Sequence, residues 1–184
     1  MPNASPERDA DAVAIRPAGA GDAEAVQRLA QHAYRGSTGR ASWAHDGPLA
    51  DGERIGQDEV AAILADEGQQ VLVAVHGDAV IGCVQVSAAG ANTATLGLLC
   101  VALPWQAAGL GGRLIAAAEA TARARPGVRA IELNVVTART RLIAFYERRG
   151  FRLTGERRPY PFPTDPPAEF AVMRKRLDGT AAGR

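Results

Sequence analysis

Apolar residues recur along this chain with two spacings, and each spacing predicts a different kind of element. Short runs rich in Val, Ile and Leu, bounded by turn residues, predict strands. These strands are expected at 13–16, 71–75, 80–86, 93–101, 130–136, 151–156 and 170–177. Apolar positions three and four residues apart predict helices, expected after Asp22 as N-cap, at 58–66, from the glycines near 110 to about 125, and at 139–149. Strands and helices together indicate an α/β domain.

Two segments follow neither spacing. The first, 35–56, is polar and rich in glycine, and it contains Trp43, His45, Asp46 and Glu53. The second holds five prolines within 159–167, which exclude regular structure there. Because a long irregular segment inside a compact domain is more often functional than accidental, we expect a functional role for 35–56.

The size and composition of the chain bound the fold further. With 184 residues and 47% hydrophobic content, the chain suits one buried core. We expect residues 12–177 to form the domain, with 1–11 and 178–184 as disordered tails. No apolar run is long enough to cross a bilayer and no signal segment opens the chain, so a cytoplasmic location without membrane contact is expected.

Charge and sulfur chemistry exclude several classes of function. The net charge of +1 gives no field for a polyanion, so nucleic acid is not an expected partner. Cys83 and Cys100 lie in apolar strands, which indicates buried, reduced thiols rather than a disulfide framework. Three scattered histidines and two distant cysteines do not form a ligand set, so no metal is expected.

The most informative chemistry lies in the turn Gln106-Ala107-Ala108-Gly109-Leu110-Gly111-Gly112, between the strand 93–101 and the next helix. A turn this poor in side chains exposes backbone N–H groups at the positive end of the helix dipole, where a pyrophosphate binds. Three glycines also suit a turn that serves only its own geometry. A P-loop needs Lys-Ser or Lys-Thr after its last glycine, and Arg113 stands there instead. A dinucleotide fingerprint matches only in part, although Glu132 lies about 20 residues downstream.

A second motif follows the strand 130–136. The helix expected at 139–149 leads into Tyr146-Glu-Arg-Arg-Gly150-Phe151. Together, the Q-x-x-G-x-G turn and this Y-x-x-x-G-F ending resemble the acyl-CoA-binding core of the GNAT superfamily of N-acetyltransferases, most closely over 95–151. The resemblance implies a GNAT-type mixed, largely antiparallel central sheet flanked by helices, in a single α/β domain.

The resemblance also assigns roles to residues of this chain. The turn from Gln106 to Gly112 would bind the pyrophosphate of acetyl-CoA, and Arg113 could screen phosphate charge. The pantetheine arm would pair with the strand edge from Leu99 to Val101, where two neighbouring strands splay apart. The cofactor-binding candidates are therefore Leu99, Cys100, Val101, Gln106, Ala107, Ala108, Gly109, Leu110, Gly111, Gly112 and Arg139. The last of these, Arg139, replaces an asparagine that often contacts the cofactor in the family.

Tyr146 is the expected catalytic residue. The resemblance gives it the role of a general acid that protonates the departing thiolate of CoA. The alternative is that its ring belongs to the core, because Leu142, Phe145 and Tyr146 share one face of the expected helix.

The motifs do not assign the general base or the acetyl acceptor. The family often carries a glutamate on the strand before the turn, but 95–101 contains no carboxylate. The candidate bases are His45, Asp46, Glu53 and Glu132, with bulk water as an alternative. In this fold the irregular segments flank the acetyl end of the cofactor, which implies substrate contacts from Trp43, Asp46, Tyr160 and Phe162.

The expected function is acetyl transfer from acetyl-CoA to a primary amine of a small molecule or peptide, by direct attack in a ternary complex. The alternative is a non-catalytic acyl-CoA sensor or interaction module with the same core, which the missing strand glutamate and Arg139 favour. A nucleotide-binding α/β domain is a further alternative. The resemblance is also compatible with a homodimer.

Overall fold

The computed structural model describes residues 12–35, 55–106, 108–161, 164 and 167–178. Its elements are β1 (Ala14–Pro17), α1 (Ala23–Arg35), α2 (Gln57–Ala65), β2 (Gln69–His76), β3 (Ala79–Ala88), β4 (Thr93–Val101), α3 (Leu110–Arg123), β5 (Ala130–Val136), α4 (Thr140–Glu147), β6 (Arg152–Pro159) and β7 (Glu169–Arg176). Short 3-10 turns at Ala20–Asp22 and Leu103–Trp105 precede α1 and α3. None of the helices in the described part of the chain is long and apolar enough to cross a bilayer.

The strands form one seven-stranded sheet in the order β1-β2-β3-β4-β5-β7-β6. β4 and β5 run parallel, and every other neighbouring pair is antiparallel. A parallel pair needs a crossover, and α3 provides it between these two strands. The expected mixed, largely antiparallel sheet in a single α/β domain is thus confirmed.

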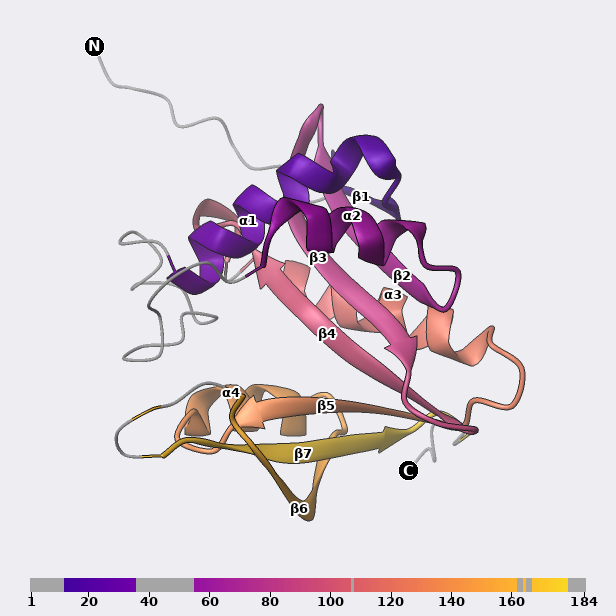
Figure 1. Ribbon diagram of the computed structural model, residues 1–184, viewed down its shortest axis with the longest axis vertical. Coiled ribbons are helices and arrows are strands. Elements are labelled where there is room, and N and C mark those ends of the chain that lie inside the picture. Colours follow the sequence, from indigo (N-terminus) through magenta and orange to yellow (C-terminus); the bar gives the residue numbers. More distant parts are fainter. Residues whose placement is uncertain (1–11, 36–54, 107, 162–163, 165–166, 179–184) are drawn as a thin grey trace.

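The helices cover both faces of the sheet (Figure 1). On one face, Val26 of α1 and Val60 of α2 pack in a buried cluster with Cys100 of β4. On the other face, Leu114 of α3 packs in a second cluster with residues of β4, β5 and β7 and with Tyr146 of α4. In the last part of β4, Leu98 and Cys100 belong to the first cluster and Leu99 and Val101 to the second, as the period of an extended strand requires. The sheet is therefore the middle layer of three.

The parallel strands β4 and β5 separate soon after they meet. Their pairing covers only Thr93–Thr95 of β4 against Ala130–Glu132 of β5. Figure 1 shows the two strands touching at one end and diverging toward the other. From Leu96 onward, β4 therefore has an edge that β5 does not pair.

A β-bulge interrupts β4 within this open stretch. The register passes from Cys83↔Cys100 to Gln85↔Gly97, so Val84 of β3 lies opposite both Leu98 and Leu99. Leu98 has φ of 45°, the only positive φ outside glycine among the described residues. Such a conformation is costly for leucine, and both strained residues and β-bulges are over-represented next to functional sites.

Candidate functional site

The open edge of β4 presents backbone groups of Leu99 and Val101. The Ala102 N–H donates to the Ile81 carbonyl at 2.8 Å, so Ala102 is directed toward β3. Because backbone polar groups alternate along an extended strand, those of Val101 and Leu99 point away from β3 and toward the gap. The backbone of Cys100 is directed to β3 by the same alternation. Two of the three residues predicted to meet the pantetheine arm thus face the open edge.

The carbonyls of Leu99 and Val101 both accept hydrogen bonds from side chains. The Tyr34 hydroxyl at the end of α1 donates to the Leu99 carbonyl at 2.9 Å. The Gln106 side-chain amide donates to the Val101 carbonyl at 2.9 Å. Gln106 was expected beside the phosphates, whereas here it contacts the strand that precedes the turn. The contact made by Tyr34 was not anticipated.

The glycine turn begins α3 as expected. Gly109 is its N-cap in the left-handed region, with φ of 78°, and a Cβ placed there would meet nothing within 4 Å. The N–H groups of Gly112 and Arg113 donate to the Gly109 carbonyl at 3.0 and 3.2 Å. The N–H groups of Leu110 and Gly111 lie ahead of these, in the part of a helix that has no internal acceptor. Ala108 and Gly109 are exposed. The turn is therefore open to a ligand, while the side chain of Leu110 is buried.

Arg149 also lies at the start of α3, and no sequence motif indicated this position. A Cβ on Gly112 would come within 3.1 Å of an Arg149 guanidinium nitrogen. Arg149 donates to the Phe145 carbonyl at 2.9 Å and stacks on the Phe145 ring at 3.6 Å. Burial, followed by the charge of Arg148, lowers the pKa of Arg149. No carboxylate pairs with it among the described residues, so the helix start combines its own positive dipole with an uncompensated guanidinium.

Arg113, the other candidate cation, is engaged elsewhere. Its guanidinium donates to the Val13 carbonyl at 2.7 Å, which ties the first turn of α3 to the segment before β1. Arg139 is the N-cap residue of α4 and is half-buried. The structure therefore places Arg139 and Arg149 at the two ends of α4, and directs Arg113 toward the segment before β1.

Tyr146 lies within the core cluster that also contains Leu99 and Val101. Its ring makes edge contacts with Phe145 and Phe151, at centroid distances of 5.3 and 5.7 Å. Burial raises the pKa of the phenol above its ordinary value, opposed by the charges of Arg139 and Arg149. No hydrogen bond of its hydroxyl to another described residue is present. Burial thus holds the side chain as a neutral phenol.

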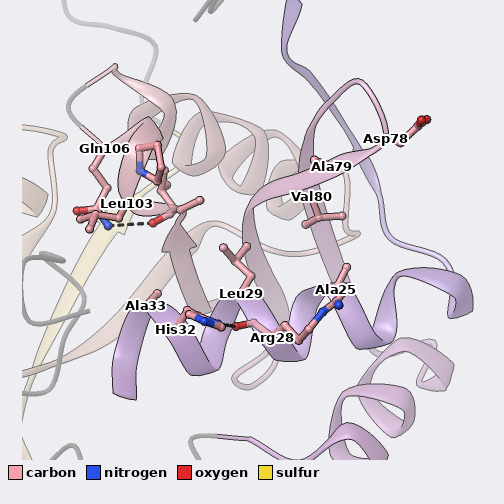
Figure 2. A pocket seen from close by; sticks show the side chains of 13 residues that line it. Ala25, Arg28, Leu29, His32, Ala33, Asp78, Ala79, Val80, Leu103 and Gln106 are labelled. Atoms are coloured by element: carbon pink, nitrogen blue, oxygen red, sulfur yellow. Dashed lines mark hydrogen bonds between the residues drawn. The ribbon is translucent and has the colours of Figure 1, made fainter. Parts of the chain in front are cut away.

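A pocket of about 580 Å³ adjoins Val101 and Gln106 on the α1 side of the sheet. Figure 2 shows α1 with Leu29 and Ala33 along one side of it, and Leu103 and Gln106 along the other. Its remaining polar groups are those of Arg28, His32 and Asp78. The pocket therefore reaches the end of β4 at Val101 from the face that carries α1.

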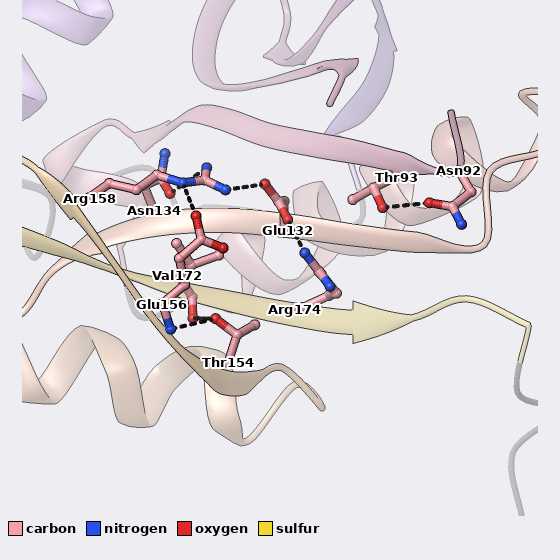
Figure 3. A network of polar contacts seen from close by, with 9 residues as sticks. All are labelled: Asn92, Thr93, Glu132, Asn134, Thr154, Glu156, Arg158, Val172 and Arg174. Atoms are coloured by element: carbon pink, nitrogen blue, oxygen red, sulfur yellow. Dashed lines mark hydrogen bonds and ion pairs between the residues drawn. The ribbon is translucent and has the colours of Figure 1, made fainter. Parts of the chain in front are cut away.

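Glu132, a candidate base, is committed to two ion pairs (Figure 3). Its carboxylate accepts from Arg158 at 3.0 Å and from Arg174 at 2.9 Å, and the residue is 4% exposed. Burial acts to raise the pKa of Glu132, but the hydrogen bonds from Arg174 and Arg158 outweigh it and hold the pKa below its usual value. A carboxylate stabilised in its charged form is a weak proton acceptor, so Glu132 is assigned to the stability of the β5–β7–β6 half of the sheet.

We expect Glu132→Gln to lower the free energy of unfolding by about 1–3 kcal/mol, because the NH₂ group of the buried amide would face an arginine donor where a carboxylate oxygen now accepts. The folded pKa of Glu132 is depressed, so its stabilisation is present above the unfolded value of 4.5 and is lost as the pH falls below it. Urea unfolding of both proteins between pH 7 and 3 measures this. A difference that grows toward low pH would contradict the assignment.

Several predicted site residues lie outside the described part of the chain. These are Trp43, Asp46, Phe162 and Ala107, together with the candidate bases His45 and Glu53. Tyr160 is described, and its ring lies 5.1 Å from that of Phe170 at the start of β7. Its contact with a substrate stays a prediction.

The mixed sheet and the glycine-capped start of α3 are those expected for an acetyltransferase of the GNAT type. The acetyltransferase (GNAT) family model matches residues 25–151, and this chain belongs to that family. No curated protein matches the sequence.

Solved structures show the same fold at low identity. A putative acetyltransferase of Salmonella typhimurium, yncA, determined with acetyl-CoA, is 21% identical with a TM-score of 0.70, covering 94% of this chain and 98% of its own. Ard1 of Thermoplasma volcanium is 22% identical with a TM-score of 0.69, covering 90% and 97%. Arabidopsis thaliana NAA60, determined with a bisubstrate analogue, is 15% identical with a TM-score of 0.70, covering 91% and 99%.

Proposed function

We propose that this protein transfers the acetyl group of acetyl-CoA to a primary amine of a small molecule or peptide, by direct attack in a ternary complex. The observation that carries the proposal is the open edge of β4, which leads directly into the backbone turn at the start of α3. Family membership supports acetyl transfer in general. Among similar structures, yncA is described with acetyl-CoA and NAA60 with a bisubstrate analogue, which fits this choice of substrates.

The phosphates of acetyl-CoA would bind at the start of α3. The N–H groups of Leu110 and Gly111 lie at the positive end of the helix dipole, which favours an anion. The uncompensated guanidinium of Arg149 beside Gly112 adds a full positive charge to the same place. From there the pantetheine arm would follow the edge of β4 past Val101 and Leu99, toward the bulge.

The bulge supplies a donor for the thioester. The Cys83 thiol donates to the Leu98 carbonyl at 3.4 Å, and a trans peptide directs the Leu99 N–H the opposite way. We assign this N–H to the thioester carbonyl oxygen, where negative charge develops during attack. The strained φ of Leu98 is then part of the site, because it fixes the direction of this donor.

The chemical step forms a C–N bond and breaks the C–S bond of the thioester. The attacking amine loses a proton and the departing thiolate gains one, so the two transfers balance. Tyr146 is proposed to give the thiolate its proton, because burial keeps the phenol protonated. With Glu132 held by arginines, the proton of the amine passes to water or to a residue outside the described part of the chain.

Binding and turnover test the proposal separately. Acetyl-CoA and CoA should raise the melting temperature of the protein, while NAD and ATP should not. A panel of small amines, amino acids and peptide N-termini should then yield acetylated product and free thiol. Stabilisation by acetyl-CoA without turnover of any amine would favour the acyl-CoA sensor. Stabilisation by NAD or ATP alone would overturn the assignment to acetyl-CoA.

Arg149→Gln is expected to weaken CoA binding roughly tenfold, because a charge-assisted hydrogen bond to a phosphate is lost. Arg148→Gln is the matched control, since Arg148 is the neighbouring exposed arginine at the end of α4. Isothermal titration calorimetry of both variants gives the comparison. Equal losses of CoA affinity in the two variants would show that the overall positive charge of this region, rather than a contact of Arg149 with a phosphate, supports binding.

A further inference from the structure

Two side chains occupy the edge of β4 that the cofactor would use. Tyr34 donates to the Leu99 carbonyl and Gln106 to the Val101 carbonyl, each at 2.9 Å. We propose that Tyr34 and Gln106 cap the open edge of β4 in place of the pantetheine arm, and that acetyl-CoA binding exchanges their hydrogen bonds for those of the pantetheine amides. This inference rests on the proposed function.

The carbonyls of an open edge need such partners. Leu99 and Val101 are 3% and 1% exposed, so water does not readily solvate them. A buried backbone carbonyl without a donor is unfavourable, and an uncovered strand edge is a template for pairing with another chain. Since β5 pairs β4 only up to Thr95, donors must come from outside the sheet.

The placement of the two donors matches that of a missing strand. Residues Leu99 and Val101 are two apart, so their carbonyls repeat about every 7 Å along the edge. A neighbouring strand, or an extended chain with amide groups, would donate at the same positions. The donors instead come from the end of α1 and from the turn before α3, neither of which is a strand of the sheet.

Exchange has a thermodynamic consequence. If the pantetheine amides replace the capping bonds, the free protein loses those bonds when it binds. Their free energy is therefore subtracted from the affinity for acetyl-CoA. Removing a cap should destabilise the free protein and strengthen cofactor binding, which is opposite to the loss expected from deleting an ordinary ligand contact.

Tyr34→Phe tests this, because it removes the hydroxyl and keeps the ring. Calorimetric titration would compare acetyl-CoA with adenosine 3′-phosphate 5′-diphosphate, which keeps the phosphates and lacks the pantetheine arm. We expect a lower melting temperature without ligand, acetyl-CoA binding tighter by roughly 2- to 10-fold, and unchanged binding of the nucleotide. Thr154→Val is the matched control, because it removes a hydroxyl bond to the Val172 carbonyl on the far side of the sheet.

Gln106→Leu provides a second variant on the other cap. The exchange predicts tighter acetyl-CoA binding here too, whereas a phosphate contact of Gln106 predicts weaker binding of both ligands and would overturn its role as a cap. Unchanged or weaker acetyl-CoA binding in Tyr34→Phe would overturn the exchange. If the wild-type protein binds no acetyl-CoA, the proposed function fails. If the wild type binds acetyl-CoA but Tyr34→Phe does not bind it more tightly, only the exchange fails.

Discussion

Tyr146→Phe is expected to lower kcat for amine acetylation by about 10²- to 10⁴-fold, the contribution typical of a positioned general acid. The reason is that the ring and its contacts with Phe145 and Phe151 persist, while the proton for the thiolate disappears. Binding of acetyl-CoA should change little, because the proposed phosphate and pantetheine contacts lie elsewhere. Steady-state kinetics with a colorimetric thiol assay, alongside calorimetric titration, measures both quantities.

The pH dependence sharpens this prediction. Burial raises the pKa of Tyr146, so the phenol should stay protonated throughout the range in which the protein is folded. The rate should therefore rise with pH as the amine becomes neutral, without an alkaline decline from loss of the phenol proton. Activity of Tyr146→Phe within threefold of wild type would assign the ring to core packing alone. Thr154→Val controls for loss of a hydroxyl elsewhere in the sheet.

The sequence predicted best the elements whose residue types follow from their own burial or backbone conformation. The strands expected at 93–101 and 130–136 have the same bounds in the structure, because most positions of both segments are apolar and buried. The glycine turn was also predictable, since a positive φ at a helix N-cap strongly favours glycine. Local chemistry was sufficient in each case.

Asp22 shows where local reasoning fails. It was expected to cap α1, but its carboxylate accepts from the Gly19 N–H at 2.8 Å and pairs with Arg16 at 2.7 Å. It therefore closes the 3-10 turn that precedes α1 and holds that turn to the end of β1. The Asp22 carboxylate could accept from the Gly19 N–H or from an N–H group in the first turn of α1. Its ion pair with Arg16 of β1 accompanies the first choice, and the sequence pattern of a helix start does not include that partner.

The contacts that matter most for the site join residues far apart in sequence. Tyr34 reaches a carbonyl 65 residues away, and Arg149 lies beside Gly112 because α3 and α4 pack on the same face. Glu132 was a candidate base in the sequence, yet two arginines from β6 and β7 pair with its carboxylate. The splay of β4 from β5 was supplied only by family resemblance, since no sequence pattern records where a pairing stops.

Gly109→Val is expected to weaken acetyl-CoA binding by about 10- to 100-fold, the loss of roughly one charge-assisted hydrogen bond. Gly109 has φ of 78°, which a β-branched residue adopts only with strain. Relaxing that strain turns the backbone at the helix start, so the N–H groups of Leu110 and Gly111 no longer converge on one anion. Calorimetric titration with acetyl-CoA measures the change.

Gly155→Val separates backbone strain from ligand binding. Gly155 on β6 has φ of 86° and also has nothing within 4 Å of a Cβ, but it lies on the edge strand at the far side of the sheet. Both variants should lose about 1–2 kcal/mol of stability, because both force a side chain into the left-handed region. Only Gly109→Val should also bind acetyl-CoA more weakly. Equal affinities in the two variants would show that the phosphates bind away from this turn, and the path proposed for the cofactor along β4 would then lose its starting point.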